Sequence, residues 1–111
     1  MSERNVVYVG RRVNDVAVVV IEDPDYRGLG KPLNPRLDLM SHSPTGFEWG
    51  YAGSGPAQLA LAILADAFSR VPNGDAVAVK LHQQFKSDFI VGIDGDTWEI
   101  TTKQIREWLY A

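Results

Sequence analysis

The strongest constraint on the fold of this chain is a helical segment that has almost no polar side. In residues 56–70, apolar side chains cover every side of a helix, and Gln58, Asp66 and Ser69 are the polar interruptions before Arg70. A helix that is apolar nearly all round is a buried helix. Residues 1–111 have the length of a single domain with one core, so this helix is predicted to form the centre of that core.

Two valine-rich runs near the N-terminus predict a β-hairpin. Residues 6–9 and 16–21 are mostly β-branched, and the polar residues 11–15 connect them. The second run is apolar on both faces, which predicts a strand that is central in the sheet or covered on two sides.

Residues 23–36 are predicted to be a long Pro/Gly surface loop. They contain three prolines and two glycines, and no apolar periodicity survives among them. Residues 37–40 alternate weakly between apolar and polar side chains, which is compatible with a short third strand.

The C-terminal half predicts two more helices and one strand. A helix is expected over residues 75–89 with Asp75 as its cap, followed by a turn at residues 94–96 and a strand at residues 97–101. Thr101 and Gln104 form a capping-box pattern that starts the last helix. The predicted fold class is therefore α+β, a small antiparallel sheet packed by three helices on one face.

Composition excludes several classes of protein. The formal charge is −3, from 11 basic and 14 acidic residues, which argues against nucleic-acid binding. The absence of cysteine removes disulfides and sulfur-based metal sites. The sequence shows no signal-like N-terminus and no apolar run that could span a membrane, so a cytoplasmic protein is expected, without cofactor or metal.

An aromatic and glycine-rich segment leads into the first helix. The string GFEWGYAGSGPAQLAL at residues 46–61 resembles the signature of a family of small prokaryotic and phage-borne proteins of unknown function, family 6166 of that series. The resemblance extends to residues 8–12, to residues 84–86 and to the end of the chain, but not to residues 23–35. It implies no named activity. The occurrence in phages implies an accessory role in mobile elements or in host–phage conflict.

The same segment holds the candidate binding site. The small residues Gly53, Ser54 and Gly55 at a helix N-terminus could bind an anion, and Trp49 and Tyr51 could stack on a ring beside it. In the alternative interpretation the glycines satisfy backbone geometry, Ser54 or Gly55 caps the helix, and the aromatic residues belong to the core. The segment matches neither a P-loop nor a dinucleotide fingerprint. His42, Arg11 and Arg12 are candidate supporting residues.

Other polar residues give no catalytic pattern. His42 stands beside Ser43 and near Asp38, but nothing resembles a nucleophile elbow, and a hydrogen bond that stabilises the loop is the expected role of His42. His82 is expected to be solvated. Asp66 is predicted either to pair with Arg11 or Arg12 or to lie on a solvated edge of its helix.

These observations favour a binding or interaction module over an enzyme, because no acid–base pair or nucleophile stands out. The expected partner is a second copy of the chain or another protein. Aromatic residues are common at the centres of interfaces, and those considered for this role are Trp49, Trp98, Trp108 and Tyr110. The alternative is a binder of a small anionic ligand or nucleotide at the aromatic and glycine-rich segment.

Overall fold

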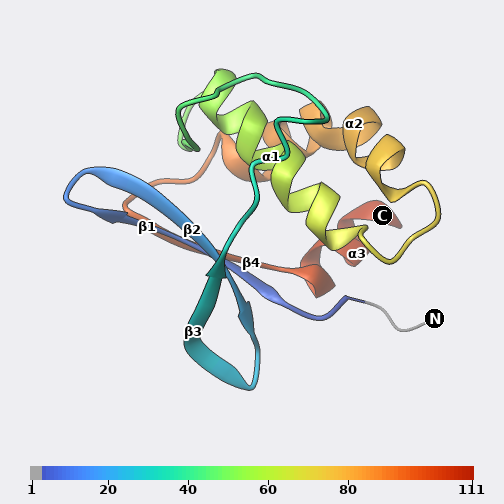
Figure 1. Cartoon of the computed structure of the whole chain (residues 1–111), viewed down its shortest axis with the longest axis horizontal. Coiled ribbons are helices and arrows are strands. Elements are labelled where there is room, and N and C mark those ends of the chain that lie inside the picture. Colours follow the sequence, from blue (N-terminus) through green and yellow to red (C-terminus); the bar gives the residue numbers. More distant parts are fainter. Residues whose placement is uncertain (1–3) are drawn as a thin grey trace.

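The computed structural model describes residues 4–111 and has an α+β fold, as the sequence predicts. A four-stranded antiparallel sheet with the order β3-β2-β1-β4 carries the helices on one side (Figure 1). In chain order the elements are β1 (Val7–Val13), β2 (Val16–Asp23), β3 (Tyr26–Pro32), α1 (Ser54–Ala67), α2 (Gly74–Phe85), the π-helical turn η1 (Lys86–Ile90), β4 (Thr97–Thr101) and α3 (Thr102–Leu109).

Helix α1 is the centre of the hydrophobic core, which confirms the prediction from its apolar surface. All residues from Gly55 to Ala65 are buried, and the sheet contributes Tyr8, Val19 and Ile100 to the same cluster. Helix α2 packs along α1, and η1 continues the chain against it. The buried helix thus has neighbours on several sides, as a helix without a polar face requires.

The predicted β-hairpin is present as β1 and β2. Val13 pairs with Val16, and Asn14 and Asp15 between them both have positive φ, as a two-residue hairpin turn of the favoured type requires. Strand β2 lies between β3 and β1, so the prediction of a central strand is confirmed. Its second apolar face remains open, because Val16 and Val18 are exposed.

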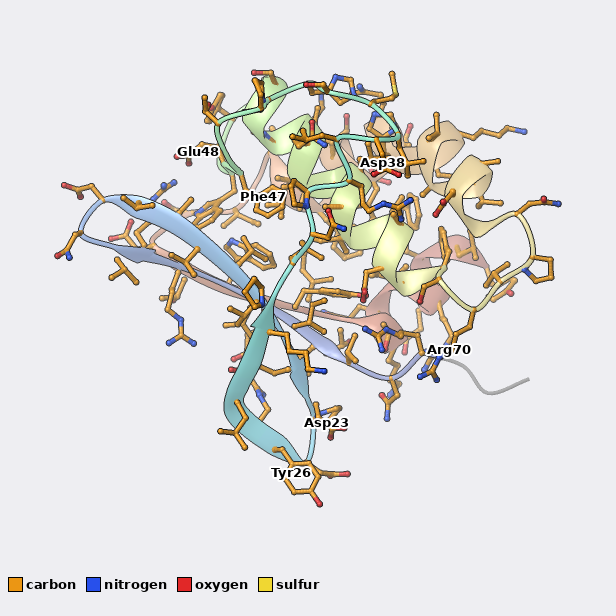
Figure 2. All side chains as sticks on the ribbon, viewed as in Figure 1. Asp23, Tyr26, Asp38, Phe47, Glu48 and Arg70 are labelled. Carbon is orange, nitrogen blue, oxygen red and sulfur yellow. The ribbon has the colours of Figure 1, made fainter. Side chains whose placement is uncertain are left out.

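The prediction of a loop over residues 23–36 is wrong, because β3 occupies residues 26–32 and pairs with β2. Every residue of this edge strand is exposed, so it carries none of the alternation that a half-buried strand shows. Close packing of β3 on β2 explains the glycine at position 30, because a Cβ there would lie 2.7 Å from Cγ2 of Val20. Figure 2 shows Tyr26 at the far end of the β2–β3 hairpin, away from the helices.

Other local predictions also need correction. Residues 37–39 form a turn instead of a third strand. Neither Ser54 nor Gly55 caps α1; its N-cap is Gly53, and no side chain bonds there. Helix α2 begins after Asn73, and Asp75 binds Arg36 instead of capping. The capping box of Thr101 and Gln104 is confirmed.

An ion-pair network fastens the β2–β3 hairpin to the rest of the sheet. Arg27 on β3 binds the buried Glu22 on β2 at 2.7 Å and Glu99 on β4 at 2.8 Å. Strand β1 lies between β2 and β4, so the Arg27 side chain crosses its outer face. Glu22 also accepts a hydrogen bond from the Gly28 amide. The hydrogen bond from Arg27, and then that from Gly28, hold the pKa of Glu22 below its usual value.

We expect Glu22→Gln to lower the free energy of unfolding at pH 7. A carboxylate whose pKa is lower in the folded chain stabilises the fold above its unfolded pKa, near 4.5, and this contribution disappears as the pH falls through the folded pKa. The melting temperatures of variant and wild type should therefore converge at acidic pH. Glu107→Gln, which removes an exposed pair with Lys103, is the control and should have little effect. A difference that is constant between pH 3 and 7 would contradict the proposed role of this charge.

Candidate functional site

The aromatic and glycine-rich segment, residues 46–56, packs into the protein at the N-terminal end of α1. Trp49 is only 2% exposed, and its Nε1 donates a hydrogen bond to the Gly95 carbonyl at 3.0 Å. Its ring meets that of Trp98 edge to face, with centroids 5.6 Å apart. The indole of Trp49 is therefore part of the core and joins this segment to the turn before β4.

Arg12 covers Trp49 from the sheet side. Its guanidinium carbon lies 4.4 Å from the centroid of the Trp49 ring, and it pairs with Glu48 at 2.8 Å and Asp96 at 3.4 Å. Two carboxylates thus balance its charge, in a cation–π geometry. The neighbouring Arg11 is directed to the other face of β1, because side chains alternate along a strand. The structure brings Arg12 to this segment and separates Arg11 from it.

The glycines beside α1 allow close packing of the segment on itself. A Cβ on Gly53 would lie 2.6 Å from the Tyr51 ring, and a Cβ on Gly55 would lie 2.7 Å from Cβ of Glu48. Tyr51 and Glu48 therefore occupy space beside the helix N-terminus. Ser54 is exposed and makes no capping bond. This arrangement favours the structural interpretation of the glycines.

Trp98 imposes a similar requirement on β1. Its partner across the strands is Gly10, and a Cβ on Gly10 would overlap the Trp98 indole. The Nε1 of Trp98 is buried and has no hydrogen-bond partner among the described residues. The indole is held by packing, so the absence of a side chain at Gly10 decides its position.

Gly10→Ala is expected to reduce the free energy of unfolding by about 1–3 kcal/mol, the usual cost of overpacking a core. The added methyl group must displace Trp98, so the tryptophan fluorescence should shift as well. Gly92→Ala is the matched control, since a Cβ at that position meets no atom within 4 Å. Equal effects of the two substitutions in a urea titration would show that Trp98 does not need the glycine.

His42 lies elsewhere, in direct contact with His82. Their Nε2 atoms are 3.0 Å apart, and Nδ1 of His82 is 2.6 Å from the Val79 carbonyl. Nδ1 of His82 must donate to that carbonyl, so its Nε2 accepts from His42. His82 is 3% exposed, so the expectation that it is solvated is wrong. The pKa of His42 is lowered by burial, and further by the charges of His82 and Lys86.

A buried glutamine holds the segment that carries His42. The amide oxygen of Gln58 accepts hydrogen bonds from the backbone N–H groups of His42 and Ser43, at 2.7 and 3.1 Å. Its amide nitrogen donates to the carbonyls of Pro35 and Met40. Gln58 is fully buried, and it was identified from the sequence only as a polar interruption of α1.

The Ser–His–Asp grouping does not form a triad. Ser43 donates its hydroxyl to the Gly46 carbonyl at 2.8 Å, and Asp38 pairs with Arg36. Both groups are therefore engaged outside the histidine pair, which gives no support to nucleophilic catalysis here.

Asp66 has partners other than those predicted. Arg4 binds both of its carboxylate oxygens, and the Tyr8 hydroxyl donates to it at 2.6 Å. The carboxylate is partly buried, so it does not lie on a solvated edge of the helix. Burial, and then the charge of Asp66, raise the pKa of Tyr8. Arg4 precedes the predicted first strand and is 62 positions from Asp66, so no pattern in the sequence indicates this pair.

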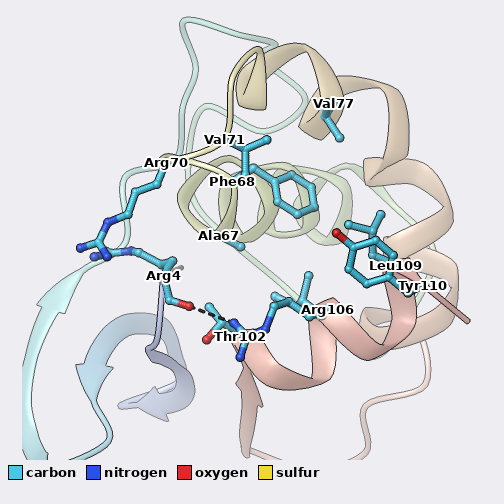
Figure 3. A pocket seen from close by; sticks show the side chains of 11 residues that line it. Arg4, Ala67, Phe68, Arg70, Val71, Val77, Thr102, Arg106, Leu109 and Tyr110 are labelled. Atoms are coloured by element: carbon cyan, nitrogen blue, oxygen red, sulfur yellow. Dashed lines mark hydrogen bonds between the residues drawn. The ribbon is translucent and has the colours of Figure 1, made fainter. Parts of the chain in front are cut away.

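A cavity of about 170 Å³ lies between α1 and α3 and is called the α1–α3 pocket (Figure 3). Figure 3 shows Arg4 and Arg70 at one end and Leu109, Tyr110 and Val77 at the other. The described residues that line it include no aspartate or glutamate. Its residues are Arg4, Ala67, Phe68, Arg70, Val71, Val77, Thr102, Ile105, Arg106, Leu109 and Tyr110.

The tryptophans considered for an interface pack within the chain. Trp108 contacts Phe85 and Phe89 edge to face, and its Nε1 donates to Asp88 at 2.8 Å. Trp49 and Trp98 pack on one another. Tyr110 is different, since it is 81% exposed at the mouth of the α1–α3 pocket.

By its fold, the chain is an α+β protein with an antiparallel sheet and a buried helix, and it has an apolar pocket rimmed by arginine. A model of the family of unknown function DUF6166 matches residues 8–111, so the chain belongs to this family. The resemblance found in the sequence is thereby confirmed. No curated protein and no solved structure matches the chain. Within residues 4–111, no helix is both long and apolar enough to cross a membrane.

Proposed function

We propose that the chain is a binding module whose α1–α3 pocket takes one apolar side chain from an acidic segment of another protein. The observation that carries this proposal is the lining of the pocket. Phe68, Ile105 and Leu109 provide apolar walls, and the described part of the chain adds three arginines and no acidic residue to the lining. An apolar anchor flanked by carboxylates matches both properties.

The size of the pocket favours a side chain over a larger small molecule. Pockets for drug-sized ligands measure roughly 300–1,000 Å³, whereas this one measures about 170 Å³. An apolar cavity of about 150 Å³ accepts benzene. A phenylalanine or leucine side chain is therefore a suitable occupant, and such anchors in pockets supply much of the affinity at protein interfaces.

The charge of the pocket favours an acidic partner. The chain as a whole carries a formal charge of −3, so a cluster of arginines contrasts with the average charge of the protein. Asp66 balances Arg4 from outside the pocket lining, and Arg106 donates a hydrogen bond to the Arg4 carbonyl. These bonds hold Arg4 and Arg106 beside the pocket. Complementary charge mainly increases the association rate and suppresses wrong partners.

An accessory role in mobile elements or in host–phage conflict is compatible with this function. A binding role of this kind needs no catalytic group. This part of the proposal depends on the family resemblance and not on the geometry of the pocket.

The test is a fluorescence-polarisation titration with a labelled pentapeptide that has a central phenylalanine between pairs of glutamates. We expect binding that is lost when serine replaces the phenylalanine or lysines replace the glutamates. Arg70→Glu should weaken binding at least about tenfold, because reversal of a rim charge creates repulsion against the acidic partner. Arg11→Glu makes the same charge change on the sheet and should leave the affinity nearly unchanged.

Three results would contradict the proposal: no binding, equal binding of the serine peptide, or equal effects of the two arginine variants. A thermal-shift assay with ATP and inorganic phosphate tests the alternative of a small anionic ligand at residues 46–56, because a ligand that binds the folded chain raises its melting temperature. Light scattering on the free chain separately tests self-association.

A further inference from the structure

We propose that His42 and His82 bind a divalent transition-metal ion of the class that prefers imidazole, such as Zn²⁺, Ni²⁺ or Cu²⁺. Their Nε2 atoms converge to 3.0 Å, and among the described residues the hydrogen-bond partners of the two rings include no carboxylate. Imidazole nitrogen is a common ligand of these three ions. The site lies between α2 and the segment before α1, apart from the α1–α3 pocket, so this inference is independent of the proposed function.

His82 is held in the orientation of a metal ligand. Its Nδ1 donates to the Val79 carbonyl one helical turn earlier, which leaves the lone pair of Nε2 directed at His42. Histidines that bind metals usually donate their other ring N–H to a carbonyl or carboxylate in this way. The ring is buried, so little conformational entropy remains to be lost when it binds an ion.

His42 is held from the opposite side by the core. The fully buried Gln58 binds the backbone N–H of His42 and of the next residue, and it also binds the carbonyls of Pro35 and Met40. These bonds hold in place the backbone to which the His42 imidazole is attached. Both histidines are thus held in place before an ion binds.

The distance between the rings fits an ion after a small movement. Two Zn–N bonds of about 2.0–2.1 Å at a tetrahedral angle place the nitrogens about 3.3–3.4 Å apart. The nitrogens must therefore separate by a few tenths of an ångström and the rings must tilt, because the ion lies off the line that joins the two nitrogens. The half-exposed His42 is the ring that can move further. Nε2 of His42 carries the hydrogen-bonded proton, so binding requires the other neutral tautomer of this ring, in which the proton has moved through water to Nδ1 and the Nε2 lone pair is free for the ion.

The other groups that could bind the ion are uncharged. The side-chain amide nitrogen of Gln83 lies 3.3 Å from Nε2 of His82, and rotation of this amide would present its oxygen instead. Water completes the coordination. Among the described residues no three His, Asp or Glu side chains gather as a metal site, and Lys86 adds a positive charge beside His42. These features predict modest affinity that responds strongly to the charge at position 86.

The experiment is a Zn²⁺ titration of the full chain, followed by NMR of the imidazole nitrogens and by calorimetry. The chain has two histidines and no cysteine, so the imidazole signals report this site directly. We expect both Nε2 signals to shift together with a stoichiometry of one ion per chain. His42→Gln keeps a donor for His82 but should weaken binding at least about tenfold, as loss of a ligand does.

Lys86→Glu should strengthen Zn²⁺ binding several-fold, because it replaces a repulsive charge with a carboxylate ligand. Asp94→Asn is the control for weak binding to surface carboxylates and should change nothing. The proposal is overturned if the imidazole signals stay unchanged at millimolar Zn²⁺, or if His42→Gln binds as tightly as wild type. Thermal melts of each variant without metal confirm that the fold is retained.

Discussion

A helix with no polar face can persist in water only when other elements surround it, and helix α1 imposes this condition on the whole chain. The sheet covers one side through Tyr8, Val19 and Ile100, and α2 and η1 pack against others. The segment between β3 and α1 passes over the remaining surface, where Gln58 binds its backbone. Burial of apolar surface provides the driving force for this arrangement.

Because α1 is buried, its few polar side chains strongly influence how the rest of the chain packs around it. A buried amide or carboxylate without partners would be costly, so Gln58 and Asp66 must find hydrogen bonds wherever the fold offers them. Gln58 finds four backbone groups of the covering segment, and Asp66 finds Arg4 and Tyr8. These bonds select one path for the chain around α1. In doing so they bring His42 to His82 and place Arg4 at the rim of the α1–α3 pocket.

Both proposed sites form because other elements of the chain surround α1. The pocket forms where α3 leaves part of the C-terminal end of α1 uncovered, between Phe68 and Leu109. The histidine pair forms where the covering segment meets α2. In contrast, the aromatic and glycine-rich segment is closed by its own side chains, since Tyr51 and Glu48 lie beside Gly53 and Gly55. The glycines of this string therefore allow the segment to pack closely at the start of the buried helix.

The sequence by itself determined the elements whose apolar pattern or capping is local: the β1–β2 hairpin, the burial of α1, the capping box of α3 and the α+β class. It could not determine β3, because an edge strand exposed on every residue has no periodicity and depends on backbone pairing with β2. It also missed the Arg4–Asp66 pair and the histidine pair, whose members are 62 and 40 positions apart. Such contacts depend on how the chain closes around α1, and only the tertiary structure decides which distant polar groups then meet.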